Sequence, residues 1–255
     1  MLALIKLHIR ENMKKNTFII FAIIGAIVSI AVVTSGSFTV NAQENISKYA
    51  QFGYQWRFLI LISSFAAVSL SMAVISKHRE GNTMDLLKLH GLSPRNQYLS
   101  RILGNVLITL FMAIILTIGM TVNILAKGIE VNVLNYLGSI SIYILASVGV
   151  AIYVTLFSML FAPAITALFG ILISAVGFLR GILLISVGNM GGVFGKIMTV
   201  LIKLAPPIDN FGELARDLFF NEFSNWNMFL NCLISLWILV GITYFVVMVV
   251  SRHEV

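Results

Sequence analysis

The sequence predicts an all-α membrane protein with six transmembrane helices, and two observations carry that prediction. Only 11% of the 255 residues are charged, whereas soluble domains average about a quarter, and the mean hydropathy is +0.97. Lys, Arg, Asp and Glu are also absent from long continuous runs, each able to cross a hydrocarbon core of about 30 Å, which takes about 20 helical residues. These runs are 16–43, 58–76, 102–126, 131–179 and 223–251.

The run 131–179 must hold two helices, because 49 residues would form one helix of about 74 Å, more than twice the membrane thickness. Pro163 supplies the division, since proline lacks the amide that a helix interior needs and restricts the residue before it. Within a single transmembrane domain, 1–255, we therefore expect spans at about 17–36, 57–76, 102–126, 136–161, 164–187 and 228–250.

Residues 1–15 precede the first span and carry both apolar and basic positions at helical spacing. Leu2, Ile5, Ile9 and Met13 recur on one side, and Lys6, Arg10 and Lys14 form an adjacent stripe. This pattern is typical of an N-terminal interfacial helix that contacts membrane lipids. The alternative is a charge cluster that only fixes topology, because cytoplasmic segments are rich in Lys and Arg. Segments 1–16 and 77–101 together hold nine basic residues, which favours a cytoplasmic position for both segments and both termini.

The segment 188–227 is the longest stretch outside the predicted spans and should be extracytoplasmic or re-entrant. Its glycines are compatible with a re-entrant element at about 181–205, because broken backbone is tolerated where protein or water covers it. Beyond Pro206 and Pro207, a short amphipathic helix is expected on the outer surface, with Asp209 as its N-cap. Its shared apolar face consists of Phe211, Leu214, Ala215, Leu218 and Phe219.

Motifs of bond-making chemistry are incomplete or missing. The stretch GGVFGK at 191–196 lacks the first glycine of a phosphate-binding loop, and Ile197 follows Lys196 where Ser or Thr is required. The sequence contains no HExxH and no GxSxG. Arg180 is the only charge within an apolar segment, and its side chain either snorkels to the outer interface or contacts an anionic substrate. We therefore expect no catalytic residue, metal site or cofactor in this chain.

The segment 77–101 is the most densely charged part of the chain, and its residues predict a helix, a turn and a second helix start. Asn82 can cap a short helix with Asp85 at its third position, and Gly91 can end that helix in a left-handed turn after His90. Ser93 can then cap the next helix, with Pro94 at its first position. A solvated loop that only orients the spans would explain the charges but not a leucine-bearing helix off the membrane.

This segment resembles the loop between the second and third helices in permease subunits of type 2 ATP-binding-cassette (ABC) transporters. The family pattern is like Glu-x-Gly-Thr-x-Glu-x-Leu-Leu followed by a Pro-x-Ser-Arg-like turn. The counterparts are Glu80, Thr83, Asp85, Leu86 and Leu87, then Gly91 through Arg95. The order of the helices along nearly all of the chain is also similar.

The resemblance implies a permease of the bacterial plasma membrane that exports its substrate. Two copies of a separate cytoplasmic ATPase, which would hold ATP and magnesium, would dock on a cytoplasmic coupling helix, and a second permease subunit would complete the pathway. The expected docking residues are Glu80, Thr83, Asp85, Leu86, Leu87, Lys88, Leu89 and Arg95. Arg180, Phe211, Leu214 and Leu218 are candidates for a substrate contact or an outer gate.

Few charges along the pathway suit a hydrophobic or amphipathic substrate, such as a peptide, an antibiotic or a lipid. Two other classes of function stay open. One is a self-contained channel or secondary transporter, and the other is a membrane-embedded enzyme. No nucleic-acid partner is expected.

Overall fold

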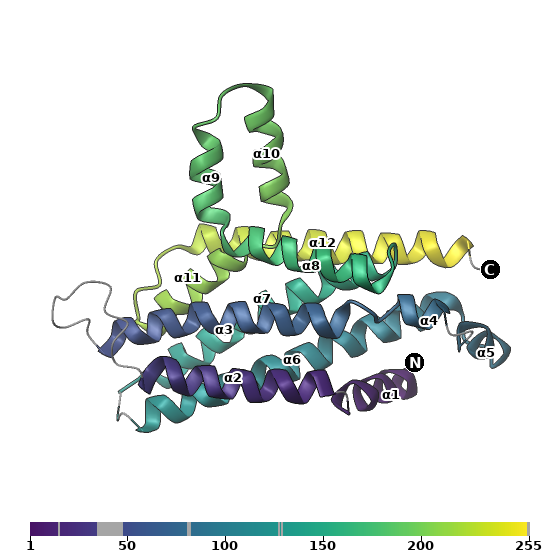
Figure 1. The fold of residues 1–255 in the computed structure, drawn as a ribbon, viewed down its shortest axis with the longest axis horizontal. Coiled ribbons are helices and arrows are strands. Elements are labelled where there is room, and N and C mark those ends of the chain that lie inside the picture. Colours follow the sequence, from purple (N-terminus) through teal and green to yellow (C-terminus); the bar gives the residue numbers. More distant parts are fainter. Residues whose placement is uncertain (15, 35–47, 81–82, 127, 129, 254–255) are drawn as a thin grey trace.

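The computed structural model describes residues 1–14, 16–34, 48–80, 83–126, 128 and 130–253 (Figure 1). All regular structure in these residues is helical, and none of it is strand. The helices are α1 (Leu2–Met13), α2 (Asn16–Thr34), α3 (Lys48–Ser71), α4 (Ser76–Glu80), α5 (Thr83–Leu89), α6 (Pro94–Ala126), α7 (Val133–Ser158), α8 (Pro163–Phe178), α9 (Arg180–Gly188), α10 (Gly192–Leu204), α11 (Ile208–Phe219) and α12 (Trp226–His253).

Four stretches are long and apolar enough to cross a membrane: Gln55–His78, Pro94–Ala126, Val133–Ser158 and Trp226–Arg252. The pair α8 and α9 would add a fifth, although the two helices are bent by 73° at their junction. The predicted all-helical fold is therefore confirmed for the described residues, and the four or five long apolar helices are consistent with a membrane protein. The first of the six predicted spans corresponds to α2, which carries no charged residue over 19 residues, and its crossing stays a prediction.

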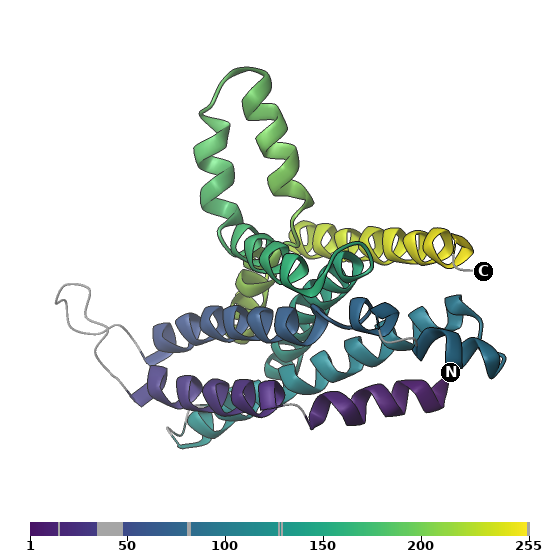
Figure 2. The same cartoon turned by 45° about the vertical axis from the view of Figure 1, so that its right-hand side comes forward.

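The long helices α3, α6 and α7 lie side by side and form the centre of a bundle (Figures 1 and 2). The start of α1, the short helices α4 and α5, and the end of α12 share one end of this bundle, called here the α5 end. Ser93, Pro94 and the start of α6 lie there too. The two ends of the chain thus lie at the same end of the bundle, as expected if both termini are on one side of the membrane. That this side is the cytoplasm stays a prediction.

Buried amide and hydroxyl groups tie the central helices together. The Asn105 amide on α6 donates to Ser71 Oγ of α3 at 2.7 Å and to Thr155 Oγ1 of α7 at 2.9 Å. Ser147 Oγ on α7 donates to Ser63 Oγ of α3 at 2.9 Å. Bonds of this kind between membrane helices are worth about 0.6 kcal/mol on average. They fix the packing of the three helices without placing a charge in the core.

The predicted helix 164–187 is wrong in one respect, because the chain bends at Leu179. Its two parts are α8 and α9, and α9 and α10 form a hairpin that stands away from the bundle (Figures 1 and 2). With 9 and 13 residues, the arms are about 14 and 20 Å long at 1.5 Å per residue. Each arm is too short to cross a hydrocarbon core of about 30 Å.

The bend has a tertiary cause. Gly177 touches the segment that begins α11, and a Cβ atom added there would lie 2.4 Å from the carbonyl oxygen of Pro206. One residue beyond the bend, Arg180 Nη1 donates to the carbonyl oxygen of Ala205 at 3.4 Å. The two ends of the hairpin are therefore held against each other by residues about 25 positions apart, and the local sequence contains no proline that would predict a break.

The helix α1 packs on α6 through polar residues. His8 and Asn12 are buried, and the His8 ring lies 2.9 Å from the position of a Cβ atom on Gly104. Leu2 and Leu7 are exposed instead, beside the exposed Lys6 and Arg10. Exposed leucines next to basic side chains are what a helix at the membrane interface requires, so the interfacial prediction keeps its basis, although half-buried Ile5 and Ile9 divide the predicted apolar stripe.

Candidate functional site

The short helix α5 ends as the sequence predicts. Gly91 has a φ of +78°, its amide donates to the carbonyl oxygen of Lys88 at 2.9 Å, and the Leu92 amide donates to that of Leu87 at 3.0 Å. These two bonds form the Schellman motif, in which a left-handed residue satisfies the last carbonyl groups of a helix. The helix therefore stops sharply at His90, and the chain turns back toward α6.

The next helix also starts as predicted. Ser93 Oγ accepts a hydrogen bond from the Asn96 amide at 3.4 Å, and Pro94 is the first residue of α6. Proline costs nothing there, because the first amide of a helix has no partner inside it. The predicted cap at Asn82 lies outside the described residues. Asp85 lies in the first turn of α5, where its negative charge interacts favourably with the helix dipole and stabilises the helix.

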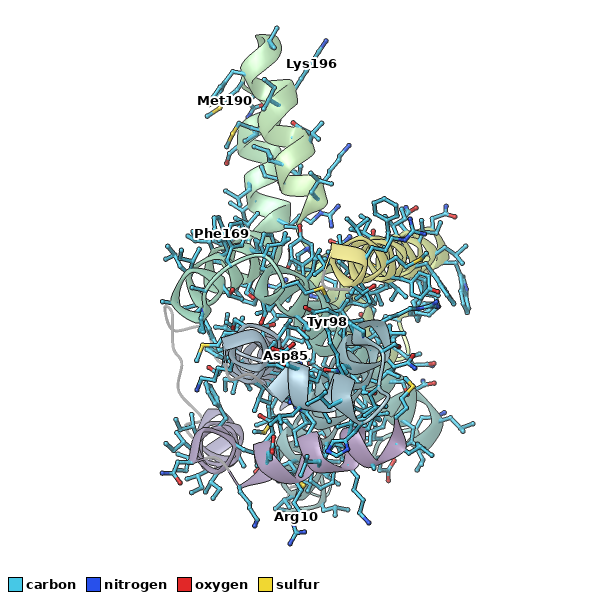
Figure 3. All side chains as sticks on the ribbon, turned by 90° about the vertical axis from the view of Figure 1, so that its right-hand side faces the viewer. Arg10, Asp85, Tyr98, Phe169, Met190 and Lys196 are labelled. Atoms are coloured by element: carbon cyan, nitrogen blue, oxygen red, sulfur yellow. The ribbon has the colours of Figure 1, made fainter. Side chains whose placement is uncertain are left out.

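The predicted docking residues divide into exposed and half-buried groups. Leu86 is 58% exposed and Leu89 is 82% exposed, whereas Leu87 and Lys88 are half-buried. Asp85 is exposed and lies at the α5 end that faces the viewer in Figure 3. Glu80 and Thr83 belong to α4 and α5, and their side chains lie outside the description. Leu86 and Leu89 are thus accessible to a partner, whereas Leu87 is only partly accessible.

A shallow hollow of about 340 Å³ lies at the turn between α5 and α6, and it is lined by Lys88, Gly91, Leu92, Ser93 and Pro94. We call the exposed residues Asp85, Leu86 and Leu89, together with this hollow, the docking surface. A short helix with apolar side chains beside a hollow is a shape that soluble partners recognise with a groove. This surface lies at the α5 end of the bundle, with α4 and the start of α6 (Figures 1 and 2).

Arg95 has a partner within the chain. Its guanidinium donates to the hydroxyl of Tyr244 on α12 and lies 5.3 Å from the centre of the same ring. The contact is a cation–π interaction that connects the start of α6 to α12. The predicted contact of Arg95 with a partner protein stays a prediction. His78 and Gln97, which the sequence did not single out, are buried beneath the docking surface at 2% and 0% exposure.

The helix α11 lies toward the other end of the bundle. Its predicted apolar face is confirmed: Phe211, Leu214, Ala215 and Phe219 are buried, and Leu218 is half-buried. They pack against α3 and α7, so this face of the helix joins the core, and its position on the outer side of a membrane stays a prediction. The predicted N-cap is wrong, because Pro207 precedes α11, no side chain caps it, and Asp209 lies inside its first turn. A gating role stays a prediction.

Arg180 is the first residue of α9 and is half-buried. Its guanidinium donates to the Ala205 carbonyl, a backbone partner that was expected neither for snorkelling to the interface nor for contact with an anionic substrate.

A second hollow, of about 390 Å³, lies between the α6–α7 connection and the end of α11. Its lining includes Glu130, Asn135 and Glu222. Arg180 does not line this hollow, and Phe219 is its only contribution from the predicted α11 face.

Among the described residues, no group of three or more His, Cys, Asp or Glu side chains could hold a metal ion. No family model matches the sequence, and a search of curated proteins gave no match.

Proposed function

We propose that this chain is the permease subunit of an ATP-driven exporter of the type 2 ABC family, without an ATPase site of its own. Two copies of a cytoplasmic ATPase, each holding ATP and magnesium, would bind it, and a second permease, identical or paralogous, would complete the pathway. The α5 end would face the cytoplasm of a bacterial cell, and the chain would cross the plasma membrane six times.

The observation that carries this proposal is the docking surface itself. Leu86 and Leu89 are exposed on a capped helix that lies outside the stretches long and apolar enough to cross a membrane. Exposed apolar groups in such a place mark a site for a protein partner. The resemblance of this same segment to the ATPase-binding loop of type 2 permeases supports an ABC ATPase as that partner.

The composition of the spans favours a transport subunit whose energy comes from a separate protein. α3, α6, α7 and α12 contain no Asp or Glu, and intramembrane acidic residues are the usual means of coupling transport to protons or sodium. The buried polar groups of the core, such as Asn105 and Ser147, are neutral and bonded to other helices. Energy for transport would therefore come through the docking surface. An apolar bundle of this kind suits a hydrophobic or amphipathic substrate.

The deciding experiment is copurification. The tagged chain, extracted in a mild detergent from its native cells, should bring an ABC ATPase with it, identified by mass spectrometry. Leu89→Arg should reduce that recovery at least tenfold while leaving the amount of inserted chain unchanged, because a charge would enter an apolar contact. His90→Arg, one residue away, is the matched control and should bind normally. Recovery of a monodisperse wild-type chain with no ATPase would contradict the proposal.

Orientation has its own test. The substitution Cys232→Ser removes the single cysteine, and new cysteines at the exposed positions His90 and Glu222 can be labelled with a membrane-impermeant maleimide. In intact cells, position 222 should react and position 90 should not. Labelling of position 90 from outside would reverse the topology.

A further inference from the structure

Gln97 occupies a joint between three helices at the α5 end. It lies in the first turn of α6 and is 0% exposed. Its Nε2 donates to the carbonyl oxygen of Leu92 at 3.0 Å, and its Oε1 lies 3.0 Å from Nε2 of His78 on α4. One buried amide thus connects the turn after α5 with the helix that follows α3.

The chemistry of the partners fixes how this amide is oriented. A backbone carbonyl can only accept a hydrogen bond, so the amide NH₂ must face Leu92. The amide oxygen is then left for His78, whose Nε2 must carry the proton and donate. Both ends of the Gln97 side chain are therefore matched, and reversing the amide would place its oxygen against the Leu92 carbonyl oxygen and break that contact.

Leu92 carries the connection into α5. Its amide donates to the carbonyl oxygen of Leu87 in the last turn of that helix, and its own carbonyl accepts from Gln97. The helix α5 makes its main packing contacts with α4 and α6, and Leu86 and Leu89 are exposed. Because little else covers α5, its position relative to the bundle depends strongly on these bonds.

His78 carries the connection into the long helices. It belongs to α4, which is separated from α3 by a short turn. The amide of Ile75 in that turn and the amide of Ser76, the first residue of α4, both approach Ser158 Oγ at the end of α7, at 3.1 and 3.4 Å. A continuous series of hydrogen bonds therefore runs from α5 through Gln97 and α4 to α7.

We propose that Gln97 is a positioning residue that holds the docking surface in one place relative to the spans and transmits a push on α5 to α4 and α7. The source of the push, an ATPase, rests on the proposed function. The joint itself rests on the geometry of this chain alone. A bundle whose docking helix were merely tethered could bind a partner without responding to it.

The first experiment needs no partner. The full chain is placed in nanodiscs of phosphatidylcholine and phosphatidylglycerol, and hydrogen–deuterium exchange is followed in peptides covering residues 83–92. Gln97→Met keeps the side-chain length but removes both polar ends, and exchange there should rise about tenfold or more, since buried partners lose their bonds. The matched control is Asn96→Met, at the adjacent exposed position, which should leave exchange unchanged.

Two further variants separate a joint from general damage. His78→Leu should resemble Gln97→Met, because it removes the donor. His78→Gln restores an amide donor and should return exchange toward the wild-type rate. Unchanged exchange in Gln97→Met would overturn the proposal, and so would a parallel increase throughout α6 and α7, because the residue would then only stabilise the whole bundle.

The second experiment uses the ATPase that copurifies with the wild-type chain. Complexes of Gln97→Met should contain as much ATPase as wild type, while the stimulation of ATP hydrolysis by the permease falls several-fold. Wild-type stimulation in that complex would refute transmission through Gln97. If the wild-type chain recovers no ATPase, the proposed function fails, and the exchange experiment still decides whether the joint exists.

Discussion

Replacing Gly177 by alanine should destabilise the fold by forcing two backbone segments apart. A Cβ atom at this position would lie 2.4 Å from the Pro206 carbonyl oxygen and 3.0 Å from Ile208 Cδ1. The isoleucine end can rotate away, but the carbonyl belongs to the backbone that begins α11 and closes the hairpin. The strain must therefore be relieved by shifting α8 from α11.

The magnitude follows from overpacking, which costs about 1–3 kcal/mol in a well-packed core. For a chain of about this size, 1 kcal/mol corresponds to about 2–4 °C in Tm, so a decrease of about 2–12 °C is expected. The Tm of Gly170→Ala should lie between those of Gly177→Ala and Gly241→Ala. Its Cβ would meet Val68 Cγ1 at 2.9 Å and Val154 Cγ2 at 3.1 Å, both on stiff side chains. Gly241→Ala meets nothing within 4 Å and should be neutral or slightly stabilising, since alanine favours helix.

The assay is the intrinsic tryptophan fluorescence of the three detergent-purified variants during heating, with the monodisperse fraction measured by size exclusion. Trp56 is buried in the central core, so its emission reports loss of packing between α3 and its neighbours. Equal Tm values for Gly177→Ala and Gly241→Ala would refute the contact between α8 and the start of α11. The order of the three values matters more than any single one.

Three further outcomes are expected. Gly91→Ala should loosen the end of α5, since its φ of +78° costs a residue with a Cβ about 1–2 kcal/mol; faster hydrogen exchange at residues 83–92 with unchanged spans would show this, and unchanged exchange would argue against the motif. Asn105→Leu removes bonds to two hydroxyls and should lower stability by about 0.6–1.7 kcal/mol, seen as a lower Tm. Arg57→Gln should change Tm little, because the pair with Glu213 is 3.7 Å long and both side chains are about 40% exposed, so its contribution is below about 1 kcal/mol; a larger loss would show that the pair is coupled to the packing of α11.

Local residue chemistry predicted the parts of the site that depend on neighbours in the chain. Gly91 and the pair Ser93–Pro94 end and start helices because a left-handed turn and a free first amide are properties of three or four adjacent residues. The apolar face of α11 was predictable for the same reason, since helical spacing fixes which side chains share a side. The cap at Asp209 failed because Pro206 and Pro207 set where that helix begins.

Contacts between distant segments decided the rest. Leu87 was grouped with Leu86 and Leu89 by sequence, and only the packing of α5 at the end of the bundle separates them. In the sequence, Gln97 and His78 are ordinary polar residues of a charged loop. They are 19 positions apart, and nothing in that spacing predicts the buried hydrogen bond between them.

The sequence by itself determined that the chain is helical and apolar enough for a membrane, where charge is excluded, and where its helices begin and end near glycine, serine and proline. Those features follow from the cost of placing charges in hydrocarbon and from the backbone preferences of single residues. Tertiary structure alone decided the bend at Leu179 and the joint at Gln97. Each depends on a contact between segments that are distant in the chain, and no local preference encodes which of them will meet.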